Sequence, residues 1–132
     1  MSEFAASEWQ RAQGALDAAH VLIDVDPNSA ASRAYYAAFH AVSALFAVRG
    51  EAFSKHSAVR AAVHRDLVHV EGWPAEFGQD YDFLFLLDLR SAGDYGGSEQ
   101  VTGEDARAAV DTARRVFDTL KRAAPELGDT TA

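Results

Sequence analysis

The 132-residue chain contains no cysteine, which excludes disulfide bonds, thiolate nucleophiles and cysteine-ligated zinc. It also has no stretch as long and apolar as a membrane-spanning helix requires. Near its start, no basic segment is followed by an apolar one, so nothing indicates secretion. These absences predict a cytoplasmic protein. Its length is sufficient to bury a core without covalent cross-links.

Positive charge is also scarce. The chain has 12 Lys and Arg residues against 20 Asp and Glu residues, which gives a formal net charge of −8. Broad electrostatic capture of nucleic acid requires a basic face. RNA binding would therefore depend on a local basic cleft, and a partner protein with a positive face fits the composition at least as well.

Apolar residues recur at the three- and four-residue spacing of a helix in five segments, and no strand is predicted. The predicted helices cover residues 3–24, 29–49, 54–70, 75–95 and 103–124. The short connections between them predict an all-α fold, an antiparallel bundle of about five helices in a single domain over residues 1–132. Residues after about 125 are predicted to form a frayed tail.

Polar residues before the helices predict their caps. Asn28 or Ser29 is expected to cap the second helix, and Ser54 the third. Thr102, with Asp105 three residues later, is typical of a capping box at the start of the fifth helix.

The middle of the fourth predicted helix, F-L-F-L-L at residues 83–87, is apolar on every side. A helix that is apolar all round is buried all round, and a single bundle core cannot cover every face of it. We therefore expect its spare face to contact a second subunit in a homodimer.

The second predicted helix places three polar side chains on one ridge. Arg33, Tyr36 and His40 follow at spacings of three and four. Arg33 and His40 are therefore two turns apart, about 10 Å along the helix axis. A guanidinium, a phenol and an imidazole on a helix otherwise patterned for burial cost stability unless each finds a partner. This ridge is the first candidate site.

The same stretch resembles a known family. R-A-Y-Y-A-A-F-H-A at residues 33–41, then R-G at 49–50 and S-K-H-S at 54–57, is similar to the signature of small prokaryotic HEPN-domain proteins. L-R-S-A-G-D-Y at 89–95 resembles the family's later arginine-to-acidic-tyrosine segment. The resemblance covers roughly residues 7–120. It implies a four-helix-bundle core, usually dimeric, and either a metal-independent endoribonuclease or a non-catalytic nucleotide-binding or adaptor module.

The resemblance also implies roles for particular residues. HEPN ribonucleases use an arginine and a histidine separated by four to six residues, and Arg33 and His40 have six between them. These two would form the catalytic pair, supported by Tyr36. In active members the pair sits on a later helix, where this chain has an arginine, an acid and a tyrosine but no histidine. Those later residues, expected either to bind substrate or to fix bundle register through ion pairs, are Arg90, Asp94 and Tyr95.

The densest cationic cluster follows Ser54. Lys55, His56 and Arg60 are candidate phosphate ligands, and a solvated helix face is the alternative interpretation. His56 and His64 lie too far apart along a helix to share one ion. We therefore predict no metal and no cofactor.

Three hypotheses follow, the first two of them implied by the resemblance to HEPN-domain proteins. In the first, the chain is an RNA-cleaving toxin of a toxin–antitoxin or defence system, neutralised by a nucleotidyltransferase-like partner; His40 would transfer a proton while Arg33 holds the scissile phosphate. In the second, it is a non-catalytic module that binds a nucleotide or a nucleotidyltransferase. In the third, it is a dimeric scaffold in which Arg33 pairs with an acid such as Asp94.

Overall fold

The computed structural model describes residues 2–92 and 100–130, and these residues form helices with no strand among them. This confirms the predicted all-α class. The elements in chain order are α1 (Glu3–Leu22), α2 (Pro27–Val48), α3 (His56–Ala62), the π-helix η1 (Val63–Val70), α4 (Ala75–Ser91), α5 (Gly103–Ala123) and the 3-10 helix η3 (Pro125–Thr130).

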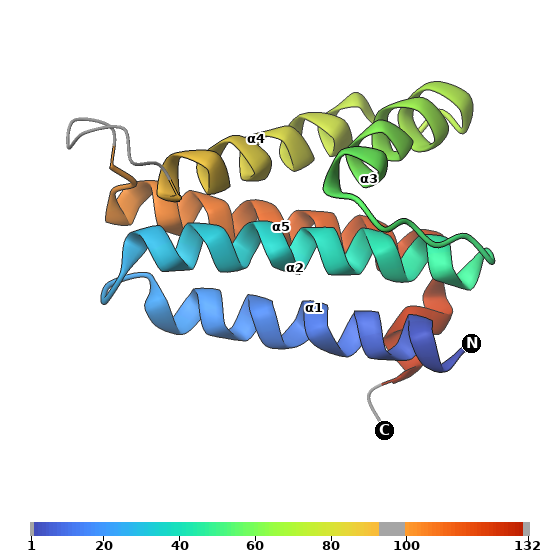
Figure 1. Ribbon diagram of the computed structural model, residues 1–132, viewed down its shortest axis with the longest axis horizontal. Coiled ribbons are helices and arrows are strands. Elements are labelled where there is room, and N and C mark those ends of the chain that lie inside the picture. The colour runs from blue at the N-terminus through green and yellow to red at the C-terminus, as the bar shows by residue number, and fades with distance from the viewer. Residues whose placement is uncertain (1, 93–99, 131–132) are drawn as a thin grey trace.

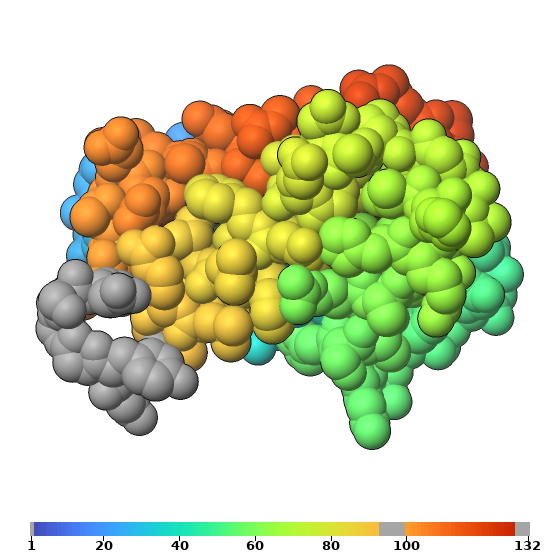
Figure 2. All heavy atoms as spheres, turned by 90° about the horizontal axis from the view of Figure 1, so that it is seen from above, coloured from blue at the N-terminus to red at the C-terminus, as the bar shows by residue number. Residues whose placement is uncertain are grey.

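The central element of the bundle is α2, which packs against α1, α4 and α5. The four long helices run in alternating directions (Figure 1), as predicted for an antiparallel bundle. α3 and η1 lie near one end of α2. Seen from above, they lie next to α4 (Figure 2).

The sequence of α2 explains its central position. Alanine has the highest helix propensity and a very small side chain, so an alanine-rich helix is stable and lets its neighbours approach closely. Larger side chains, including Tyr35, Leu45 and Phe46, fill the remaining space and are almost completely buried. The alanines of α2 that are fully buried are Ala30, Ala31, Ala34, Ala37, Ala38, Ala41 and Ala44.

The start of α2 differs from the prediction. Its N-cap is Asp26 rather than Asn28 or Ser29, and the Asp26 carboxylate accepts hydrogen bonds from the Ser29 backbone N–H at 3.2 Å and from Ser29 Oγ at 2.6 Å. Pro27 occupies the first turn of the helix. An N–H in the first turn of a helix has no partner within the helix, so proline loses nothing there, and Pro27 begins α2 instead of interrupting it.

The third predicted helix was wrong in two respects. Its N-cap is Lys55, without a side-chain cap, rather than Ser54. From Val63 onward the helix has the wider π form. Val59, Val63, Leu67 and Val70 recur at helical spacing, which predicts that all four face the core. A π-helix rotates less per residue than an α-helix, so this stripe is lost after Leu67, and Val70 is 71% exposed.

The fourth helix carries the expected uncovered apolar face. It ends at Ser91, and residues 93–95 of the predicted helix lie outside the described ranges. Phe83, Leu86 and Leu89 are 37%, 54% and 49% exposed. The bundle therefore leaves one apolar stripe of α4 in contact with solvent.

The C-terminal part combines a confirmed cap with a corrected tail. Thr102 and Asp105 form the predicted reciprocal capping box at the start of α5. The residues after about 125 were expected to fray, but Pro125–Thr130 form η3. Leu127 is fully buried in the core, and this contact holds the short helix in place. Within residues 2–92 and 100–130, no helix has the length and apolar character needed to cross a membrane.

Candidate functional site

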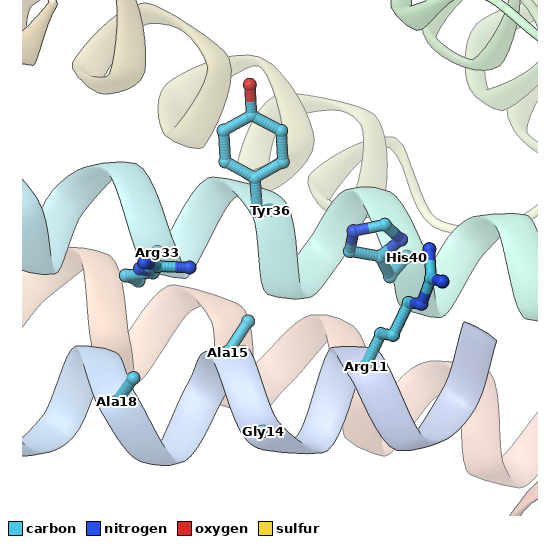
Figure 3. A pocket seen from close by; sticks show the side chains of 7 residues that line it. All are labelled: Arg11, Gly14, Ala15, Ala18, Arg33, Tyr36 and His40. Atoms are coloured by element: carbon cyan, nitrogen blue, oxygen red, sulfur yellow. The ribbon is translucent and has the colours of Figure 1, made fainter. Parts of the chain in front are cut away.

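A groove of about 340 Å³ lies between α1 and α2 and contains the whole predicted ridge. Arg33, Tyr36 and His40 line it from α2 (Figure 3). On the α1 side, three of its lining residues are small, which leaves room for the groove. The residues contributed by α1 are Arg11, Gly14, Ala15 and Ala18.

His40 is held in place by a carboxylate from the neighbouring helix. Its Nδ1 lies 2.7 Å from Oε2 of Glu8, whose side chain is only 9% exposed, whereas the His40 side chain is 21% exposed. With Nδ1–H donating to the carboxylate, Nε2 keeps its lone pair. The contact with Glu8 therefore fixes the orientation of the imidazole through Nδ1, and Nε2 is left to face the groove.

Glu8 and Arg11 join the site without having been predicted from the sequence. Arg11 Nη1 lies 3.9 Å from Glu8 Oε1, so the carboxylate has one imidazole and one guanidinium beside it. Figure 3 shows Arg11 extending from α1 beside His40. One indication was available: Glu8 is three residues after Ala5 and four before Ala12, which places a carboxylate on the buried stripe of α1.

Arg33 is exposed, and its side chain makes no hydrogen bond or ion pair with any residue in the described ranges. Its predicted structural partner, Asp94, lies outside the described residues. Tyr36 is 37% exposed and rises from α2 on the side away from α1 (Figure 3). Its ring centroid lies 6.3 Å from that of His40 and 5.5 Å from that of His56, so it stands between two imidazoles.

His56 and Arg60 from the predicted cationic cluster line a second cavity, of about 730 Å³, formed by α3, η1 and α4. Arg60 Nε and His64 Nε2 each lie 2.9 Å from the same oxygen, Oδ1 of Asp82. Burial alone would raise the pKa of Asp82, but the hydrogen bonds from Arg60 and His64 outweigh it and hold the pKa below its ordinary value. The Arg60 guanidinium also lies over the Phe85 ring, 4.7 Å from its centroid.

His56 connects this cavity to the core. Its Nδ1 lies 2.9 Å from the hydroxyl of Tyr35, and its ring stacks on Phe39 with the centroids 4.0 Å apart. Burial raises the pKa of Tyr35, so the phenol stays protonated and can donate to the imidazole. Lys55, by contrast, is exposed and lines neither the groove nor this cavity.

The later predicted segment is separate from the groove. Arg90 Nη2 donates to Asp105 Oδ2 at 3.2 Å, so this guanidinium is paired with the capping residue of α5. Asp94 and Tyr95 lie outside the described residues. Across residues 2–92 and 100–130, no three histidine or acidic side chains are placed to hold a metal ion.

The groove between α1 and α2 thus offers a defined set of groups. An oriented imidazole can accept or donate a proton at Nε2. Two guanidinium groups, those of Arg11 and Arg33, can bind the oxygens of a phosphate. An exposed phenol ring provides a surface on which a base can stack.

Comparisons with known proteins agree with this fold. The sequence pattern of the family described as HEPN domain matches residues 6–123. A UPF0332 protein from Thermotoga maritima is 36% identical over 124 residues, which cover 87% of this chain and 92% of that protein. The crystal structure of TT1696 from Thermus thermophilus superposes with a TM-score of 0.77 at 20% identity and covers 92% of this chain and 98% of that one. At that identity, the structural match supports the fold alone.

Proposed function

Because the chain belongs to the HEPN domain family, we propose that it is a metal-independent endoribonuclease of a toxin–antitoxin or defence system, with the groove between α1 and α2 as its active site. The observation that carries this proposal is the contact of 2.7 Å between His40 Nδ1 and the buried carboxylate of Glu8. A histidine oriented in this way, with Arg11 beside it and Arg33 further along the same groove, offers a proton acceptor and phosphate ligands for RNA cleavage without a metal.

In the proposed reaction, His40 Nε2 accepts the proton of a ribose 2′-hydroxyl. The 2′-oxygen attacks the adjacent phosphorus, and the bond from phosphorus to the 5′-oxygen breaks. The leaving oxygen takes a proton from water, and the hydroxide that remains takes the proton back from His40 to give water. The products are a 2′,3′-cyclic phosphate and a 5′-hydroxyl. Glu8 stabilises the imidazolium that forms, in the way that a buried carboxylate supports a catalytic histidine elsewhere.

The arginines supply the electrostatic part of the reaction. Arg33 has no partner among the described residues, so its guanidinium is free to hold the scissile phosphate and offset the charge that develops on it. Arg11 is shared only loosely with Glu8, at 3.9 Å. This groove provides the local basic cleft that a chain with a net charge of −8 needs in order to bind RNA.

The uncovered stripe of α4 supports a homodimer, which is compatible with an endoribonuclease and with a non-catalytic binding module alike. Phe83, Leu86 and Leu89 form an apolar surface of the kind that marks protein contacts. We propose that this stripe pairs two copies of the chain in a homodimer. A nucleotidyltransferase-like antitoxin would then bind elsewhere, and the acidic net charge favours a partner with a positive face.

One experiment separates cleavage from simple binding. Purified protein is incubated with total RNA in excess chelator, alongside His40→Asn and Arg33→Ala variants. The proposal predicts cleavage by the unmodified protein and none by His40→Asn, because asparagine cannot accept the proton. Arg33→Ala should cleave at least tenfold more slowly, because one charged hydrogen bond to the transition state is removed. Equal cleavage by all three proteins would refute the assignment of this groove.

A further inference from the structure

The groove and the cavity are neighbours on the surface, and Tyr36 forms the boundary between them. Tyr36 lines the groove between α1 and α2, and its ring meets His56, which lines the cavity of α3 and α4, edge-on at 5.5 Å. Phe39 lies beneath this boundary, in contact with both His40 and His56. A ligand leaving the groove over Tyr36 therefore reaches the cavity without crossing another helix.

The cavity has hydrogen-bond donors to spare. Arg60 uses Nε for Asp82, while its two terminal nitrogens have no partner in the described part of the chain. His56 uses Nδ1 for the Tyr35 hydroxyl, and Nε2 has no such partner. Ser57 adds a hydroxyl at the rim. These donors fit the oxygens of a phosphate, and the Phe85 ring beneath Arg60 gives the same cavity an apolar wall.

We propose that single-stranded RNA follows one track across the molecule, from the groove between α1 and α2, over Tyr36, into the cavity of α3 and α4. There Arg60 and His56 bind the phosphate of a nucleotide beyond the scissile one, and a base stacks on Tyr36. This proposal rests on the proposed function, because RNA is taken as the ligand. It assigns the second cavity as a binding site that selects longer substrates and leaves the cleavage chemistry to the groove.

The position of Arg60 favours phosphate binding over a purely structural role. Its side chain is 41% exposed even though Nε is paired, so the terminal nitrogens remain accessible. Asp82 and Phe85 restrain the guanidinium from two directions, which reduces the entropy lost when a phosphate binds. Stacking on an exposed aromatic ring accepts every base, so the track would show little sequence preference.

The test measures binding separately from cleavage. The probe is a fluorescent 12-nucleotide RNA of random sequence with 2′-O-methyl riboses, which has no 2′-hydroxyl and cannot be cut. Arg60→Gln and Ser57→Glu are compared with Arg65→Gln as the matched control. Arg65 lies five residues further along, is 62% exposed on its side chain, pairs with Asp66 and lines neither the groove nor the cavity. Ser57→Glu adds a repelling charge to the cavity without removing the Arg60 side chain, so it remains informative if Arg60→Gln loosens the fold.

The expected result is about tenfold weaker binding for both cavity variants, and a shallower salt dependence for Arg60→Gln, because the slope falls with the number of phosphates that the protein neutralises. Arg65→Gln should bind like the unmodified protein. If both cavity variants bind the 12-mer normally while His40→Asn abolishes cleavage, this inference falls and the proposed function stands. If His40→Asn still cleaves, the proposed function falls, and the binding data still decide the track.

Discussion

Replacing His40 in two ways separates its structural contribution from its chemistry. Alanine removes the partner of Glu8, whose side chain is 9% exposed, and leaves it only Arg11 at 3.9 Å. A buried charged group that loses its hydrogen bond costs about 1–3 kcal/mol, and the void left by the ring adds to this. We therefore expect His40→Ala to lower the free energy of unfolding by about 2–4 kcal/mol.

Asparagine should retain most of this stability. Its amide nitrogen is attached to Cγ, as Nδ1 is in histidine, so His40→Asn keeps a donor directed at Glu8. We expect its free energy of unfolding to lie within about 1 kcal/mol of that of the unmodified protein, because the hydrogen bond is preserved. The exposed Arg33, which has no partner in the described ranges, provides the control: Arg33→Ala should change the free energy of unfolding by no more than about 0.5 kcal/mol.

Urea denaturation monitored by circular dichroism gives the free energy of unfolding of each of the three variants. RNA cleavage is measured without urea on the same protein preparations. If His40→Ala is as stable as the unmodified protein, the contact with Glu8 contributes nothing and the case for an oriented imidazole fails. If His40→Asn is as unstable as His40→Ala, the ring itself is structural, and the scaffold hypothesis gains support.

Three further outcomes follow from other contacts. Because the pKa of Asp82 is lowered in the fold, its contribution to stability is complete above the unfolded pKa of about 3.9 and is lost as the pH falls through the lower folded value. Urea denaturation should therefore find the Asp82→Asn variant less stable than the unmodified protein at pH 7, and this difference should shrink as the pH is lowered below about 3.9. A Cβ at Gly78 would lie 2.9 Å from Cε1 of His64, whereas Gly14 has open space around it; Gly14→Ala should therefore raise the free energy of unfolding by about 1 kcal/mol, and Gly78→Ala should show no such gain. Removing the α5 cap with Thr102→Ala should cost about 1 kcal/mol in the same assay, and Thr102→Ser should cost much less.

Much of the fold could be predicted from the sequence because helix periodicity is local. The stripes of α2 and α5 and the exposed apolar face of α4 follow from residue spacing within each helix. The cap of α2 at Asp26 could not be singled out among three nearby polar residues, since any of them can accept the first free N–H groups. The spacing of apolar residues does not distinguish the π-helix η1 from an α-helix, so the sequence predicts Val70 on the core side, whereas it faces solvent.

The candidate site shows where local patterns stop being informative. The ridge of α2 could be identified from spacing, and its residues do share one groove. The groups that orient the ridge and the cationic cluster could not be identified in the same way. Glu8 is 32 residues from His40, and Asp82 is 18 residues from His64. Which side chains meet at such separations depends on how each helix is rotated against its neighbours, and this is set by packing of the whole bundle.

The central claim is that His40, held by Glu8, removes a proton from a ribose 2′-hydroxyl. The most direct measurement is the mass of the fragment ends released from a synthetic RNA in excess chelator. The account predicts 2′,3′-cyclic phosphate and 5′-hydroxyl ends from the unmodified protein, and intact RNA with His40→Asn. Fragments carrying 5′-phosphate ends, or cyclic phosphate ends produced equally well by His40→Asn, would contradict it.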